Sequence, residues 1–87
     1  MGLYRKKPVV IEAEQFTKPE NYEYSKTKVC GFLVLEDING DYFMLIPTLE
    51  GTHKASVGDW IVKGIVGEFY PVKDSIFKAT YELVIQE

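Results

Sequence analysis

The stretch GDWIVKGIVGEFYP, residues 58–71, places three glycines among β-branched and aromatic residues. DWIVK (59–63) and EFYPV (68–72) have the length and composition of short strands, and GIVG between them is typical of a turn. The pattern therefore predicts a glycine-cornered hairpin with Trp60 and Phe69 directed into the core. Asp59 and Glu68 would either accept hydrogen bonds from turn amides or line a surface that a partner touches, and the pattern leaves both interpretations open.

The segments before this hairpin also read as strands and turns. PVVIEAEQF (8–16) alternates, which predicts a strand with Val9, Ile11 and Ala13 on its inner face. TKPENYEYSKTK (17–28) is polar and reads as a loop, whereas VCGFLVLED (29–37) reads as one buried strand. Asn39-Gly40 is a strong hairpin signal before a strand at 42–46. TLEGTHKAS (48–56) predicts a further hairpin with Gly51-Thr52 at its tip.

The segments after residue 72 change character. KDSIFKAT (73–80) predicts a short helix that Asp74 or Ser75 caps, with Ile76, Phe77 and Ala79 facing inward. YELVIQE (81–87) alternates and predicts a final strand that closes the sheet. The whole pattern predicts one small β-rich domain over residues 1–87. Its fold class is mainly β, a small antiparallel barrel or rolled sheet of about six strands with one short helix near residues 74–80, with α+β as the alternative.

Composition restricts the classes of function. The net charge of −3 argues against nucleic acid as a partner, because such binding needs a basic face. The single cysteine, Cys30, excludes an internal disulfide, and its apolar neighbours predict a buried, inert thiol. We expect a cytoplasmic protein with no membrane partner, because MGLYRKKP does not have the apolar run of a signal peptide and no stretch is long enough to span a membrane.

Catalytic and metal chemistry have little support in the sequence. His53 is the only histidine, so the nitrogen and sulfur ligands of a zinc site are too few. EDINGDYF (36–43) superficially resembles a calcium loop, but it has too few ligands and reads better as a hairpin turn. The glycines do not form a phosphate-binding loop. We therefore expect that the protein is not an enzyme and that it has no catalytic residues, no metal site and no cofactor.

Aromatic and charged residues of the opening stretch are the candidates for binding. Tyr70 is close in sequence to Lys63 and Lys73, a combination that could form a small stacking and anion-binding site. Packing in the core or contact between subunits is the favoured explanation of the aromatic residues, and a ligand site is the alternative. The candidate binding residues are Asp59, Trp60, Lys63, Glu68, Tyr70 and Lys73.

The C-terminal half resembles a family of small uncharacterised proteins from phages and prophages of bacteria. The similarity is carried by IPTLEGTHKASVGDWIVKGIVGEFYPVKDSIFKATYE (46–82), which follows the pattern GDWI-x-x-G-x-x-GEFYP…IF-x-x-TYE, and by the opening YRKKPVVIEAEQF. It covers roughly half to two-thirds of the chain. Val57 stands where the family usually has proline, and Val72 replaces its usual cysteine, so a role that rests on that cysteine does not apply.

This resemblance implies an accessory phage protein of unassigned activity in the cytoplasm of a bacterial host cell. We expect it to act by binding rather than catalysis, as a homo-oligomer or with a host protein as partner. A small-ligand protein that sequesters a nucleotide is one alternative. A minor structural component of the virion is another.

Overall fold

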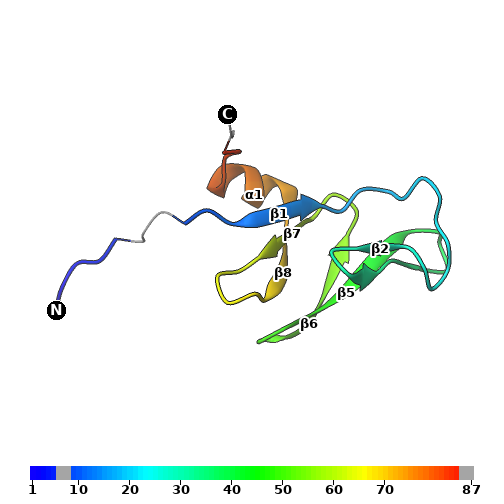
Figure 1. The fold of residues 1–87 in the computed structure, drawn as a ribbon, viewed down its shortest axis with the longest axis horizontal. Coiled ribbons are helices and arrows are strands. Elements are labelled where there is room, and N and C mark those ends of the chain that lie inside the picture. The colour runs from blue at the N-terminus through cyan, green and yellow to red at the C-terminus, as the bar shows by residue number, and fades with distance from the viewer. Residues whose placement is uncertain (6–8, 85–87) are drawn as a thin grey trace.

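The computed structural model describes residues 1–5 and 9–84, which form a mainly β protein (Figure 1). Within these residues the chain forms eight strands in three antiparallel sheets and one short helix. The described sheets do not close into a barrel, so the rolled-sheet form of the prediction is the one observed. No helix among the described residues is long and apolar enough to cross a membrane.

The predicted glycine-cornered hairpin supplies the central strand and one edge strand of the first sheet. This sheet has the order β1-β7-β8, with β1 at Glu12–Gln15, β7 at Trp60–Lys63 and β8 at Phe69–Val72. Its turn is closed by the amide of Gly64, which donates to the carbonyl of Glu68 at 2.6 Å. The central position of β7 explains its apolar WIV run, because a central strand is covered on both faces.

The second sheet is a meander of β4 (Leu35–Glu36), β5 (Tyr42–Thr48) and β6 (Gly51–Ser56). The hairpin predicted at Asn39-Gly40 is confirmed and joins β4 to β5. Of its two turn residues only Gly40 has a positive φ, 83°, as in a loop whose last residue is left-handed. Within this hairpin the amide of Asp37 donates to the carbonyl of Asp41 at 2.9 Å.

The single buried strand predicted at 29–37 is wrong. The chain instead turns back at Cys30-Gly31, so β2 (Lys28–Val29) pairs with β3 (Phe32–Leu33) as a two-stranded sheet. Both turn residues have positive φ, 52° and 83°, which is the requirement of a two-residue hairpin loop. The glycine of the apolar run therefore acts as a turn residue rather than as part of a strand.

The hairpin of residues 48–56 also turns earlier than predicted. Thr48 pairs with Gly51, so Leu49 and Glu50 form the tip rather than Gly51-Thr52. The hydroxyl of Thr48 donates to the carbonyl of Gly51 at 2.7 Å and accepts from the amide of Glu50 at 3.1 Å. These bonds close the turn two residues before the predicted place.

The inner face predicted for the first strand is wrong as well. Within the described part of 8–16, only Glu12–Gln15 is a strand. Val9 and Ala13 are exposed, and only Ile11, just before the strand, is half-buried. β1 is an edge strand, so its two faces receive less cover than those of β7. The residue that enters the core is Phe16, which follows the strand and is fully buried.

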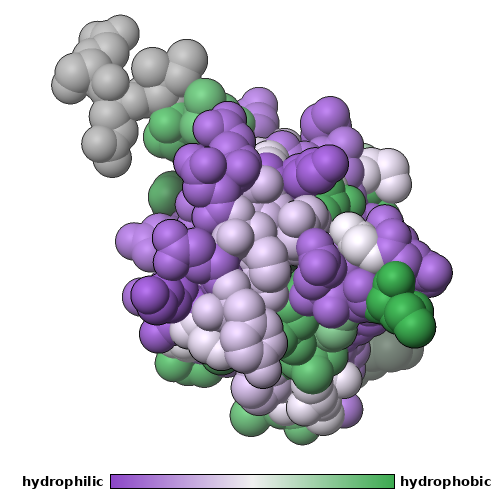
Figure 2. Space-filling model, turned by 90° about the vertical axis from the view of Figure 1, so that its right-hand side faces the viewer, coloured by the Kyte–Doolittle hydropathy of each residue, from purple (hydrophilic) through white to green (hydrophobic). Residues whose placement is uncertain are grey.

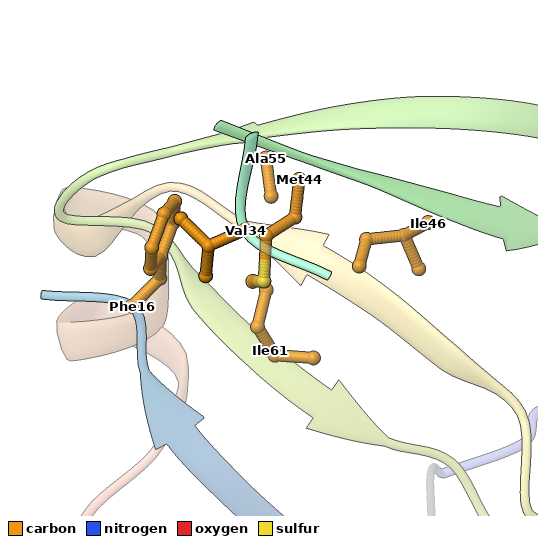
Figure 3. Packing of buried hydrophobic residues seen from close by; sticks show 6 residues of the cluster. All are labelled: Phe16, Val34, Met44, Ile46, Ala55 and Ile61. Carbon is orange, nitrogen blue, oxygen red and sulfur yellow. The ribbon is translucent and has the colours of Figure 1, made fainter. Parts of the chain in front are cut away.

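One core lies between the first and second sheets (Figure 3). Phe69 of β8 packs against it and meets Phe32 edge-to-face, with ring centroids 5.4 Å apart, as predicted for Phe69. Trp60 is half-buried on the other side of the first sheet and lies outside this cluster. The buried residues of the core are Phe16, Val34, Met44, Ile46, Ala55 and Ile61.

The predicted short helix is confirmed as α1 (Asp74–Thr80). Its N-cap is Lys73, and no side chain caps it, so the predicted capping by Asp74 or Ser75 is not observed. Of the residues predicted to face inward, only Phe77 is half-buried, and Ile76 and Ala79 are exposed.

The strand predicted at 81–87 is not observed over 81–84, and residues 85–87 lie outside the described part of the chain. The ring of Tyr81 stays against that of Phe77, with centroids 5.0 Å apart. Tyr81 therefore stays with the helix rather than with a sheet, and Leu83 beyond it is 87% exposed.

Candidate functional site

The first sheet divides the candidate binding residues between its two faces. Cross-strand partners share a face, and neighbours along a strand alternate. Trp60 and Tyr70 therefore lie on the face that carries α1, because Tyr70 pairs with Val62. Lys63 lies on the opposite face of the sheet, which is the face on which Ile61 packs into the core. The six candidates thus do not converge on one pocket.

Asp59 stabilises the turn between β6 and β7. Its carboxylate is 7% exposed and accepts a hydrogen bond from the amide of Ser56 at 2.9 Å. It also forms an ion pair of 3.3 Å with Lys73, another candidate. Gly58 has a φ of 101° and donates its amide to the carbonyl of Phe16 at 2.7 Å. The interpretation of Asp59 as an acceptor for a turn amide is the one that the geometry supports.

Trp60 attaches the helix to the sheet. Its indole Nε1 donates to Oδ1 of Asp74 at 2.8 Å, and its ring stacks on Phe77 with centroids 4.1 Å apart and planes 7° from parallel. The hydrogen bond from Trp60, followed by the one from Lys78, lowers the pKa of the Asp74 carboxyl. We call Trp60, Asp74 and Phe77 the helix clamp.

Glu68 stabilises the turn at the opposite end of β7. Its Oε2 accepts from the amide of Val66 at 3.2 Å, within the turn between β7 and β8. A side chain at Gly64 would displace this carboxylate from its place in the turn. Glu68 is therefore also an acceptor for a turn amide, although part of its side chain reaches the surface.

The remaining candidates are separated or already paired. Lys63 lies 4.0 Å from a carboxylate oxygen of Glu12, and Lys73 is paired with Asp59. Burial, followed by a hydrogen bond with Tyr81, raises the pKa of the Tyr70 hydroxyl. The stacking and anion-binding site predicted from Tyr70, Lys63 and Lys73 is therefore not formed in this structure.

An apolar groove lies between the tip of the β5–β6 hairpin and strand β8, and we call it the tip groove. Its volume is about 300 Å³. Leu49, at the tip of one hairpin, is 91% exposed, and Ile65 and Val66, at the turn of the other, are 80% and 82% exposed. Both turns project at the same end of the molecule (Figure 1). The groove is lined by Thr48, Leu49, Glu50, His53, Glu68, Phe69, Tyr70 and Pro71.

Sequence reasoning included only Glu68 and Tyr70 of this groove among the candidates. The signal that could have found the rest is the presence of apolar residues in turns, where polar residues and glycine are usual. Leu49 occupies a two-residue turn, and Ile65-Val66 stand between two glycines. Hairpin turns do not need such side chains, so their presence points to another role.

A second hollow of about 430 Å³ lies at the start of β5 and contains charges of both signs. Lys54 lies over the ring of Phe43, 4.9 Å from its centroid. The carboxylate of Asp37 accepts from the amides of Asn39 and Asp41 at 2.9 and 3.0 Å. These bonds belong to the hairpin turn, in agreement with the hairpin interpretation of EDINGDYF.

The end of the molecule opposite the tip groove is mostly hydrophilic (Figure 2). Its hydrophobic side chains appear as separate patches. Cys30 is half-buried in the β2–β3 turn, where its thiol donates to Glu14 at 3.1 Å. Burial and the neighbouring carboxylate raise the pKa of the Cys30 thiol to about 11, which is the opposite of what a reactive cysteine needs.

The part of the chain that the structure describes contains no group of three or more histidine, cysteine, aspartate or glutamate residues that could hold a metal ion. Comparison with protein-family models, with curated proteins and with solved structures finds no match for this chain. The tip groove is therefore identified from its geometry alone, and it is the candidate functional site.

Proposed function

We propose that this chain is a phage- or prophage-derived accessory protein that acts in the bacterial cytoplasm by binding a polypeptide, through self-association or with a protein partner, rather than by catalysis. The resemblance of residues 46–82 to phage proteins supports the origin. The observation that carries the mode of action is the tip groove, an apolar hollow that the exposed Leu49 lines, with the exposed Ile65 and Val66 in the turn at the same end of the molecule.

Apolar side chains at these tips favour binding for a thermodynamic reason. Removal of apolar area from water is favourable by about 25 cal/mol per Å² before the entropic cost of association is subtracted, whereas the same area left in water contributes nothing to the fold. Leu49 lines the groove, and Ile65 and Val66 expose two more apolar side chains in the turn at the same end of the molecule (Figure 1). An exposed apolar patch of this kind marks an interaction site more often than a scattered single residue does.

The nucleotide-sequestering alternative has less support. Such a ligand needs cations that are free to meet its phosphates, but Lys63 and Lys73 each lie beside a carboxylate. Tyr70, which would stack on the base, already forms a side-chain hydrogen bond with Tyr81. A polypeptide partner makes better use of the tip groove, because it can contact apolar tips without a cluster of cations.

The test is native mass spectrometry of tagged protein purified gently from a bacterial host, in wild type and in the variant Leu49→Ser/Val66→Ser. We expect an associated polypeptide in the wild type, either a second copy or another protein, and its loss in the variant. Ile38→Ser is the matched control, because Ile38 is fully exposed in the β4–β5 turn, at the opposite end of the seven-residue strand β5. A wild-type protein that carries no polypeptide, or a control that loses it equally, contradicts the proposal.

A further inference from the structure

The N-terminal residues form an arm that leaves the body of the protein. Figure 1 shows residues 1–5 away from all three sheets, on the side where the turns of the tip groove project. Leu3 is 103% exposed and Tyr4 97%, so neither packs on the domain. A leucine and a tyrosine that project into solvent can insert into an apolar groove, and the tip groove has an apolar lining that includes Leu49, Phe69 and Pro71.

The charges of the arm and of the rest of the chain are opposite. Residues 1–11 contain three basic residues, Arg5, Lys6 and Lys7, and no acidic residue. Residues 12–87 contain the other seven basic residues and all thirteen acidic ones. The groove itself is lined by Glu50 and Glu68 and by no lysine or arginine. Within the described residues neither glutamate takes part in an ion pair.

We infer that the tip groove binds the N-terminal arm of a second copy of this chain, with Leu3 and Tyr4 in the groove and Arg5 beside Glu50. The inference rests on the proposed function, and it names the polypeptide that the groove takes. Leu49 and Phe69 supply apolar surface for the two anchors. Tyr4 suits this position because a tyrosine can bury its ring while its hydroxyl stays in water.

The direction of the arm favours a second copy over the same molecule. Glu12 pairs with Lys63, at the end of β7 next to the β7–β8 turn, so the arm leaves the sheet there. The order β1-β7-β8 puts the groove beyond β8, on the far side of the sheet from β1. The arm of the same chain would have to reverse and cross the turn, whereas the arm of a neighbour can enter directly. Reciprocal exchange of two arms closes a two-fold symmetric dimer, so assembly stops at two copies.

Analytical ultracentrifugation of the full chain tests this inference with two variants. The arm variant is Leu3→Asp/Tyr4→Asp. The groove variant combines Leu49→Asp, in the lining of the groove, with Val66→Asp, in the adjacent turn whose amide bonds the groove residue Glu68. We expect a concentration-dependent dimer in the wild type and a dissociation constant weaker by about tenfold or more in each variant, since buried anchors dominate such contacts. Circular dichroism should show an unchanged fold, because all four side chains are exposed in the monomer.

Mixing the two variants is the decisive step. Neither variant alone retains an intact arm–groove contact, but the mixed dimer retains one, between the arm of the groove variant and the groove of the arm variant. We therefore expect the mixture to dimerise more tightly than either variant alone. A mixture that dimerises no better than its components contradicts arm exchange, and so does a wild type that stays monomeric over the whole concentration range.

A charge exchange tests the contact between Arg5 and Glu50. Arg5→Glu and Glu50→Arg should each weaken the dimer, and the double variant should recover most of the loss. Glu20→Arg is the control, because Glu20 is exposed in the loop after β1 and distant in sequence from both hairpin tips. No recovery in the double variant would remove Arg5 from the contact. If arm exchange fails but the groove variant still loses a different associated polypeptide from the host, the proposed function stands and only the identity of the partner changes.

Discussion

The two ends of strand β7 differ in how completely their side chains are used by the fold. At its start, the carboxylate of Asp59 and the indole of Trp60 are both engaged in internal contacts, at 2.9 Å and 2.8 Å. At its other end, Ile65 and Val66 extend into solvent from the turn that follows. Within fewer than ten residues, the chain therefore passes from side chains that stabilise the fold, Asp59 and Trp60, to apolar side chains that are exposed in a turn, Ile65 and Val66.

This difference shows that a dense motif is not in itself a binding site. GDW concentrates a glycine, an acid and an aromatic residue, and each contributes to the local structure. The glycine adopts a left-handed backbone, the acid accepts a bond from a turn amide, and the aromatic residue attaches α1. The surface that remains for a partner consists of residues without such a structural role. The contrast makes opposite predictions for substitutions at the two ends.

Trp60→Ala should have the largest effect on stability among the residues that the two ends present. It removes the stack on Phe77 and the hydrogen bond to Asp74, so the helix loses its main attachment to the sheet. We expect the free energy of unfolding to fall by about 2–4 kcal/mol, slightly below the usual range for a buried aromatic residue because Trp60 is half-buried. Guanidinium unfolding followed by circular dichroism measures it.

Trp60→Phe is the matched control for this prediction. It keeps a ring against Phe77 but removes the indole donor, so we expect a loss of about 1 kcal/mol, the net contribution of one hydrogen bond. A Trp60→Ala protein as stable as the wild type would show that the helix clamp does not hold α1, and the comparison between the two ends would fail.

Asp59→Ala should cause the next largest loss in the free energy of unfolding. The carboxylate is nearly buried, and its removal leaves the amide of Ser56 without its acceptor. We expect a destabilisation of about 1–3 kcal/mol, the cost of an unsatisfied buried polar group. Lys73→Ala separates this bond from the ion pair: the lysine side chain is 65% exposed, so its loss should change stability by less than about 1 kcal/mol. Equal effects of the two substitutions would assign the role of Asp59 to the ion pair instead.

Local signals account for the parts of the fold that the sequence predicts well. The hairpins at Asn39-Gly40 and at residues 64–67 and the helix at 74–80 depend on turn and helix preferences within a few residues. The failures are of another kind. The apolar run 29–37 contains its own turn at Cys30-Gly31, and an apolar pattern does not reveal which glycine takes a positive φ.

Strand formation near the C-terminus needs a partner, and alternation alone does not supply one. Tyr81 keeps its contact with Phe77, so residues 81–84 do not join a sheet despite their alternating pattern. The same reason limits prediction of the site. The groove forms because the tip of the β5–β6 hairpin comes to lie beside β8, and this juxtaposition of residues about twenty positions apart is not visible in the motif.

Substitutions at the tips of the two hairpins, Leu49 and Val66, should cause the smallest change in the stability of the monomer. Leu49→Ser and Val66→Ser should each alter the free energy of unfolding of the monomer by less than about 0.5 kcal/mol, because these side chains are more than 80% exposed. Ile46→Ala is the control on the same strand as the Leu49 hairpin: Ile46 is fully buried, so its loss should be about 2–4 kcal/mol.

Protein concentration separates the fold from the contact at these same tips. A dimer that forms only from folded chains raises the melting temperature as concentration rises, whereas an intrinsic effect on the monomer does not depend on concentration. We therefore expect the melting temperature of the wild type to increase with concentration and that of Leu49→Ser/Val66→Ser to stay constant, with the two proteins equal at high dilution. If the variant is less stable even at high dilution, the tips belong to the fold as the helix clamp does, and the distinction between the two ends of β7 is lost.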